Sequence, residues 1–183
     1  MWILENECFT ATVLAAGGEL VSLWHKPTRT ERLWQPQADV WNHTATQLFP
    51  VVGRLIQGGL WLDGQFWPLP AHGFLREQTF YCVTQTPDTL MLEACSSTQT
   101  RKQWPRHWRI RLVFVLEACG LTFHQTIVND DSRTLPYSTG WHPGFALAVS
   151  SCSGWWVEFS PAVSGPYFTV NRTLKTDGGQ RNV

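Results

Sequence analysis

The chain has 183 residues, equal numbers of acidic and basic side chains, and only 15% charged residues. Its length suits one domain that buries a real core. A formal net charge of zero leaves no electrostatic footprint for nucleic acid or an anionic membrane surface, and no apolar run approaches the length of a membrane span.

Strand patterns dominate the chain from its start. The segments that read as strands are residues 2–14, 19–24, 31–34, 60–62, 65–67, 79–85, 89–95, 109–116, 121–128, 155–159 and 167–170. Gly17-Gly18 and Thr86-Pro87-Asp88 predict hairpin turns between neighbouring segments. Asp63-Gly64 is the strongest turn signal, because this pair suits a type I′ turn.

Helical periodicity is missing from the sequence. No convincing run of apolar residues at i, i+3, i+4 and i+7 is found, so the pattern predicts a nearly all-antiparallel β architecture. Residues 35–46 and 96–103 are expected to be loops. We expect a single domain over residues 1–175 and a polar, glycine-rich tail over 176–183.

Cysteine usage points to a reducing compartment. The five cysteines are Cys8, Cys82, Cys95, Cys119 and Cys152. The number is odd and no Cys-x-x-Cys pair occurs, which argues against a disulfide framework and a zinc site. Since the N-terminus also lacks the pattern of a signal peptide, we expect a cytoplasmic protein.

The stretch from Leu48 to Arg76 concentrates residues suited to a binding site. It contains Leu48-Phe49-Pro50-Val51-Val52-Gly53-Arg54, then Asp63-Gly64, then Ala71-His72-Gly73-Phe74-Leu75-Arg76. Pro50 restricts the backbone, and Gly53 and Gly73 allow a close backbone approach next to a charged side chain. A polar group held by rigid neighbours can meet a ligand at low entropic cost. The alternative is that His72 is a satisfied, half-buried histidine and that both arginines are solvated.

A later segment, Tyr137-Ser138-Thr139-Gly140-Trp141-His142-Pro143-Gly144-Phe145, adds a second histidine, and Thr100-Arg101-Lys102-Gln103-Trp104-Pro105 lies between the two. In order and spacing these segments resemble the aldose 1-epimerase (galactose mutarotase-like) family. One branch of that family carries Leu-Phe-Pro-x-x-Gly-Arg, an Asp-Gly hairpin, His-Gly-Phe-x-Arg and Ser-x-Gly-x-His-Pro-x-Phe. The resemblance implies the family's fold, a large antiparallel twisted β-sandwich, of which this chain holds the first part.

The resemblance also implies a reaction, the interconversion of the α and β anomers of a hexose through the open-chain aldehyde. A base takes the proton of the C1 hydroxyl while an acid protonates the ring oxygen. The acid would be His142, because imidazole titrates near neutral pH, and His72 would bind a sugar oxygen or support the acid. Substrate contacts are expected from Arg54, Arg76, Trp41 and Trp141.

The chain has eleven tryptophans, of which some are expected to stack on sugar faces, although all could instead fill a thick β core. The other histidines are expected to be structural, as for His124, or solvated, as for His25, His43 and His107. No cofactor is expected, and a metal site at His72 and His142 is disfavoured because no carboxylate accompanies them.

The general base is the gap in this interpretation. The resemblance places the family's glutamate in a later part, beyond residue 183, and neither Glu158 nor Asp177 has a similar context. We therefore expect an incomplete fold and an impaired epimerase, acting on a free or phosphorylated hexose, since arginine pairs well with phosphate. The alternatives are a non-catalytic carbohydrate-binding module and an inactive truncated product.

Overall fold

The computed structural model describes residues 1–147, 156–158, 160, 166–170 and 176–182. The strands are β1 (Trp2–Glu5), β2 (Phe9–Val13), β3 (Leu20–His25), β4 (Thr30–Glu31), β5 (Ala45–Leu48), β6 (Gly59–Leu62), β7 (Gln65–Pro68), β8 (Tyr81–Gln85), β9 (Thr89–Cys95), β10 (Trp108–Glu117), β11 (Gly120–Asn129), β12 (Gly140–Pro143), β13 (Pro166–Val170) and β14 (Thr176–Asn182). Helix in the described residues is limited to the 3₁₀ turn η1 (Leu75–Glu77) and to α1 (Thr98–Arg101). Neither is long or apolar enough to cross a membrane.

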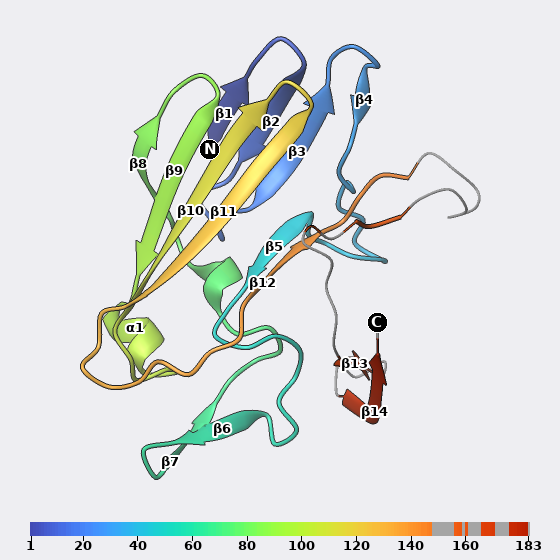
Figure 1. Cartoon of the computed structure of the whole chain (residues 1–183). Coiled ribbons are helices and arrows are strands. Elements are labelled where there is room, and N and C mark those ends of the chain that lie inside the picture. Colours follow the sequence, from blue (N-terminus) through green and yellow to red (C-terminus); the bar gives the residue numbers. More distant parts are fainter. Residues whose placement is uncertain (148–155, 159, 161–165, 171–175, 183) are drawn as a thin grey trace.

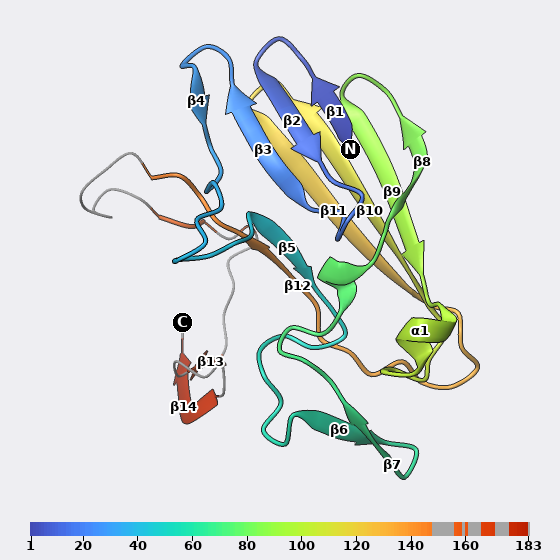
Figure 2. The same cartoon turned by 180° about the vertical axis from the view of Figure 1, so that it is seen from behind.

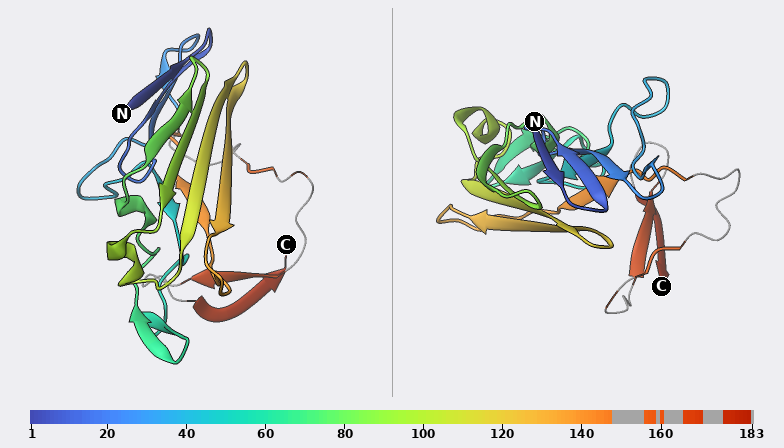
Figure 3. Two further views of the ribbon diagram at one scale, coloured as in Figure 1. Left: turned by 90° about the vertical axis from the view of Figure 1, so that its left-hand side faces the viewer. Right: turned by 90° about the horizontal axis from the view of Figure 1, so that it is seen from above.

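Two four-stranded sheets form the body of the molecule. One has the order β1-β2-β3-β4 and the other β11-β10-β9-β8, and neighbouring strands in both run antiparallel. The sheets lie face to face, as the front and back views show (Figures 1 and 2). Viewed from the side they form two layers (Figure 3). The predicted all-β sandwich is confirmed.

The core lies between these sheets and follows from strand alternation. Every second residue of β10 from Trp108 to Leu116 is buried, and the same face of β9 contributes Leu90 and Leu92. The opposite sheet supplies the buried side chains Leu4, Phe9, Ala11, Val13 and Leu20. Each large apolar side chain buried in this way stabilises the fold by about 1.5–3 kcal/mol.

The predicted turn at Asp63-Gly64 is confirmed. Both residues have positive φ, 52° and 77°, as a type I′ turn requires, and they join β6 to β7. The tip of this hairpin is tied to the rest of the molecule by ion pairs from Asp63 to Arg106 at 2.8 Å and to Arg133 at 3.1 Å. The Arg106 hydrogen bond is the largest cause that lowers the pKa of Asp63.

Local side-chain bonds explain three departures from the predicted elements. Residues 2–14 form two strands, because the Asn6 carboxamide accepts hydrogen bonds from the amides of Cys8 and Phe9 and turns the chain. The predicted loop 96–103 contains α1, which Ser97 and Thr100 cap reciprocally. The predicted strand 31–34 is replaced by the shorter β4, which ends at Glu31 because the carboxylate of Glu31 accepts hydrogen bonds from the amides of Arg32 and Leu33.

The last predicted elements have mixed outcomes. The strand expected at 167–170 is confirmed as part of β13, and residues 176–182, expected as a tail, pair with it as β14. Residues 156–158 are not in a strand, while the flanking residues 155 and 159 lie outside the described residues. The single-domain boundary at residue 175 stays a prediction.

A smaller two-stranded sheet positions the candidate site. β12 pairs antiparallel with β5, so that His142 lies opposite Thr46 and Trp141 opposite Gln47. In Figures 1 and 2 this pair lies beside the lower part of the sandwich, between its sheets and the β6–β7 hairpin. Because β5 runs directly into the Phe49–Arg54 segment, the register of this sheet brings the two histidine-containing segments together.

Candidate functional site

The site is built around two histidines that are distant in sequence. His142 lies on β12 and is exposed, whereas His72 lies in the turn after β7 and is half-buried. Their ring centroids are 6.0 Å apart. The ring of Trp41, from the loop that precedes β5, lies 5.0 Å from that of His142. The fold thus gathers three of the predicted site residues at one place.

The backbone of His72 adopts a conformation that is uncommon for a residue with a side chain. Its φ is +66°, in the left-handed region, which costs a non-glycine residue on the order of 1–3 kcal/mol. Two hydrogen bonds to Gly53 hold it there: the His72 amide donates to the Gly53 carbonyl at 2.8 Å, and the Gly53 amide donates to His72 Nδ1 at 3.1 Å. Such strain is found where the surrounding structure requires one orientation of a side chain.

Glycine is needed at the next position. Gly73 has φ +70°, and a Cβ added there would lie 2.1 Å from the Phe49 carbonyl oxygen. That oxygen accepts hydrogen bonds from the amides of Phe74 at 3.0 Å and Leu75 at 3.3 Å. The close approach therefore fastens the His72 turn to the end of β5.

Positive charge surrounds His72. Its pKa is lowered below the ordinary value of 6.5, first by burial and then by the charges of His142, Arg76 and Arg54. His72 is therefore neutral at pH 7. Arg76 also donates to the Ala71 carbonyl at 3.5 Å, whereas exposed Arg54 makes no side-chain hydrogen bond or ion pair to a described residue.

The two predicted tryptophans differ in position. Successive strand residues point to opposite faces, and Trp141 stacks on Phe123 with ring centroids 4.5 Å apart. It packs against the core, so Trp41 rather than Trp141 is the ring beside His142. The role of Trp141 as a sugar contact stays a prediction.

Trp41 is itself held by residues that the sequence analysis did not single out. Trp34 Nε1 donates to the Trp41 carbonyl at 3.1 Å, and a Cβ on Gly144 would lie 2.8 Å from both Trp34 Cβ and Trp41 Cζ3. Glu19 accepts from the amides of Thr44 and Ala45 at 2.6 and 3.0 Å. In the sequence, Gly144 directly after His142-Pro143 could have indicated a close contact at this point. The loop sequence shows no period that could have indicated Trp34 or Glu19.

The sequence of this chain is similar to that of a known protein family. Residues 1–160 match the family model described as aldose 1-epimerase. The chain belongs to the aldose 1-epimerase family. The protein LacX of Lactococcus lactis is 26% identical over 78% of this chain, and YphB of Escherichia coli is 26% identical over 91% of it.

Solved structures of the family are also similar. A galactose mutarotase related enzyme of Lactobacillus acidophilus superposes with a TM-score of 0.87 at 25% identity over 99% of the chain. A galactose mutarotase-like protein of Lactobacillus casei gives 0.87 at 27% identity over 98%. The chain spans 61% and 63% of those structures and 49% and 61% of the two curated relatives.

Opening a sugar ring by acid–base catalysis requires a base as well as an acid. None of the carboxylates among the described residues forms an ion pair or hydrogen bond with His72 or His142. Glu19 lies nearby in the fold, but its carboxylate pairs with His43 at 3.5 Å. Half-buried His43 lies with its ring 6.3 Å from that of Trp41, in place of the solvated position expected for it. No described group of three histidine, cysteine or acidic residues could hold a metal ion.

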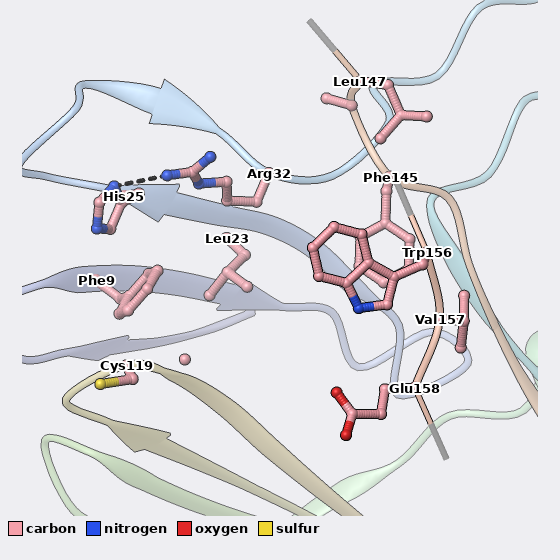
Figure 4. A pocket seen from close by; sticks show the side chains of 12 residues that line it. Phe9, Leu23, His25, Arg32, Cys119, Phe145, Leu147, Trp156, Val157 and Glu158 are labelled. Atoms are coloured by element: carbon pink, nitrogen blue, oxygen red, sulfur yellow. Dashed lines mark hydrogen bonds between the residues drawn. The ribbon is translucent and has the colours of Figure 1, made fainter. Parts of the chain in front are cut away.

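A cavity of about 940 Å³ lies elsewhere in this aldose 1-epimerase fold (Figure 4). Its walls include the apolar side chains of Phe9, Leu23 and Trp156, and Glu158 and the hydrogen-bonded pair His25 and Arg32 are its charged or polar groups. None of the predicted site residues lines it. The cavity is therefore separate from the pair His72 and His142. His25 is half-buried, whereas the sequence predicted a solvated position for it.

Proposed function

We propose that this chain binds an aldose ring at Arg54, His72 and Trp41 and donates a proton to the ring oxygen from His142. The observation that carries the proposal is the meeting of the two histidine rings, 6.0 Å apart, from separate segments that both match the family's motifs. The aldose 1-epimerase family implies sugars as substrates, and the site offers groups of the right chemistry for them.

Each side chain has a physical reason for its proposed role. Imidazole can give and take a proton near neutral pH, so His142 can protonate the ring oxygen as the C1–O5 bond breaks and recover the proton when the ring closes. The guanidinium of Arg54 can donate to hydroxyl oxygens and stabilise negative charge that develops on them. The indole of Trp41 offers a flat apolar face to the C–H groups of the sugar.

The experiment that tests the proposal measures anomer exchange directly. NMR exchange spectroscopy or polarimetry on a panel of free aldoses should show faster interconversion with the purified chain than in buffer. A preparation of His142→Ala made in the same way controls for contaminating epimerase. Rates equal to buffer for every sugar would remove the claim of catalysis.

A second function, sugar binding without turnover, is favoured by one observation: no described carboxylate contacts the histidine pair. Deprotonation of the C1 hydroxyl would then depend on water or on a group outside the described residues. Titration of sugars while tryptophan fluorescence is followed separates the two proposals, because binding without exchange supports the second. Comparing free and 6-phosphorylated hexoses in this titration tests whether Arg54 selects a phosphate.

A further inference from the structure

We infer that the main-chain amide of Gly53 sets the tautomer of His72 and so makes His72 a hydrogen-bond donor to the sugar, not the acid that opens the ring. The tautomer follows from geometry alone. The donor role toward a sugar rests on the function proposed above. Gly53 is in this sense a positioning residue that acts through its backbone.

The direction of one hydrogen bond carries the inference. Gly53 N lies 3.1 Å from His72 Nδ1, and an amide N–H can only donate. Nδ1 must therefore present its lone pair, and a neutral imidazole with an unprotonated Nδ1 carries its proton on Nε2. The His72 amide in turn donates to the Gly53 carbonyl at 2.8 Å, and this second bond holds the His72 backbone next to the Gly53 amide.

The surroundings oppose a second proton on the ring. Protonating Nδ1 would set its N–H against the N–H of Gly53. The ring is half-buried, and Arg54, Arg76 and His142 are the charged or titratable groups that act on it, all of them basic. These effects lower the pKa of His72 and keep it neutral.

The two histidines therefore have different abilities. No described residue hydrogen-bonds Nε2 of His72, so its N–H is available to a hydroxyl or ring oxygen of a ligand. His142 makes no side-chain hydrogen bond to any described residue, so no such bond holds it in one tautomer. A neutral imidazole whose Nδ1 accepts from a main-chain amide is a poor acid but a good hydrogen-bond donor through Nε2, which fits the donor role for His72 and leaves the acid role proposed above to His142.

The test of the tautomer is NMR of the full chain without sugar. Ring nitrogen shifts and long-range ¹H–¹⁵N correlations should show His72 as a single tautomer, with Nδ1 unprotonated and Nε2 carrying the proton. Loss of these signals in His72→Asn assigns them. Finding the proton on Nδ1, or a mixture of tautomers like that of free histidine, would overturn the inference whether or not the protein binds sugar.

The same variant tests the donor role. The carboxamide oxygen that His72→Asn introduces can accept from the Gly53 amide, and asparagine tolerates a left-handed φ, but it offers no donor at the position of Nε2. The unfolding midpoint should stay near that of the parent chain, while sugar affinity should fall roughly two- to thirteenfold, the equivalent of one hydrogen bond. His124→Asn is the matched control that should change neither, because His124 is exposed on β11 and does not have the structural position that the sequence suggested.

The outcomes separate this inference from the proposed function. If the parent chain binds no aldose, the proposed function fails while the tautomer is still decided by the spectra. If the tautomer is confirmed and His72→Asn binds sugar as tightly as the parent, the donor role is overturned. Should His72→Asn not fold, the spectra of the parent chain alone decide the tautomer, and the pH dependence of its sugar affinity decides the donor role. A neutral donor predicts affinity that is constant above the lowered pKa of His72.

Discussion

The glycine after His72 offers a sharp test of how the site is built. Gly73→Ala places a methyl group 2.1 Å from the Phe49 carbonyl oxygen in a left-handed backbone. Gly58→Ala is a closely matched control, because Gly58 has φ +71° against +70° for Gly73, yet an added Cβ there meets nothing within 4 Å. The two variants share the same conformational cost, and only Gly73→Ala adds a collision to it.

The structure allows the magnitude of each change to be worked out. The left-handed conformation alone costs an alanine about 1–2 kcal/mol, which is the expected loss for Gly58→Ala. In Gly73→Ala the Phe49 carbonyl must also move away from the amides of Phe74 and Leu75, and an unsatisfied buried donor costs about 1–3 kcal/mol. With both amides left unsatisfied, the loss for Gly73→Ala, including the left-handed conformation, is roughly 3–8 kcal/mol. This is a large share of the roughly 5–15 kcal/mol by which a domain is ordinarily stable.

Urea unfolding followed by tryptophan fluorescence measures both variants against the parent chain. We expect a modest shift of the midpoint for Gly58→Ala and a shift several times larger, or failure to fold, for Gly73→Ala. Sugar binding should survive in the first variant and be lost in the second. Equal destabilisation by the two substitutions would refute the reasoning, since it would mean that the contact with Phe49 adds nothing.

Three further predictions concern the histidines and the β6–β7 hairpin. His142→Ala should reduce any anomer exchange by about 10²–10⁴-fold, whereas His124→Ala should leave the rate largely unchanged, and equal losses would show that the acid is misassigned. Because the folded state lowers the pKa of His72 below 6.5, the unfolded chain binds more protons between the two pKa values. His72 therefore contributes stability that is fully present above its ordinary pKa and is lost as pH falls through the lowered value. Urea midpoints across this window should rise with pH more steeply for the parent than for His72→Asn, and parallel curves would contradict this. Asp63→Asn should speed amide hydrogen exchange in the hairpin by removing the ion pairs at its tip, with Asp39→Asn as an exposed control. Unchanged exchange in Asp63→Asn would show that the ion pairs do not hold the hairpin.

The elements that the sequence predicted well are those with a local cause. Alternation of apolar and polar residues indicated β10, because a strand half-buried on one sheet face must follow a period of two. Asp63-Gly64 indicated its turn, because few other pairs accept two successive positive φ angles. A four-residue helix such as α1 is too short for a helical period, and only the Ser97 and Thr100 cap could have indicated it.

The composition of the site was likewise available before its geometry. The motifs named Arg54, His72 and His142 as residues of interest, and the family match agrees with the resemblance on which they were chosen. The sequence did not show which of the two predicted tryptophans, Trp41 or Trp141, lies beside the histidines. Adjacent strand residues face opposite ways, but the pattern does not say which face of β12 is the core side until β12 is paired with β5.

Residue order thus determined most of the strands, the turns and the chemical groups present, because these depend on neighbours along the chain, whereas β5, β12 and β14 were not predicted. Tertiary structure alone decided that the rings of His72 and His142 meet, that Trp41 rather than Trp141 lies beside them, and that Glu19 is paired with His43. It also decided which ring nitrogen of His72 carries the proton, because the donor to Nδ1 is the amide of Gly53. Gly53 precedes the β6–β7 hairpin in the sequence, whereas His72 follows it. The physical reason is that hydrogen-bond direction, burial and the field of neighbouring charges depend on distances in space, which the pairing of distant strands sets and local sequence does not.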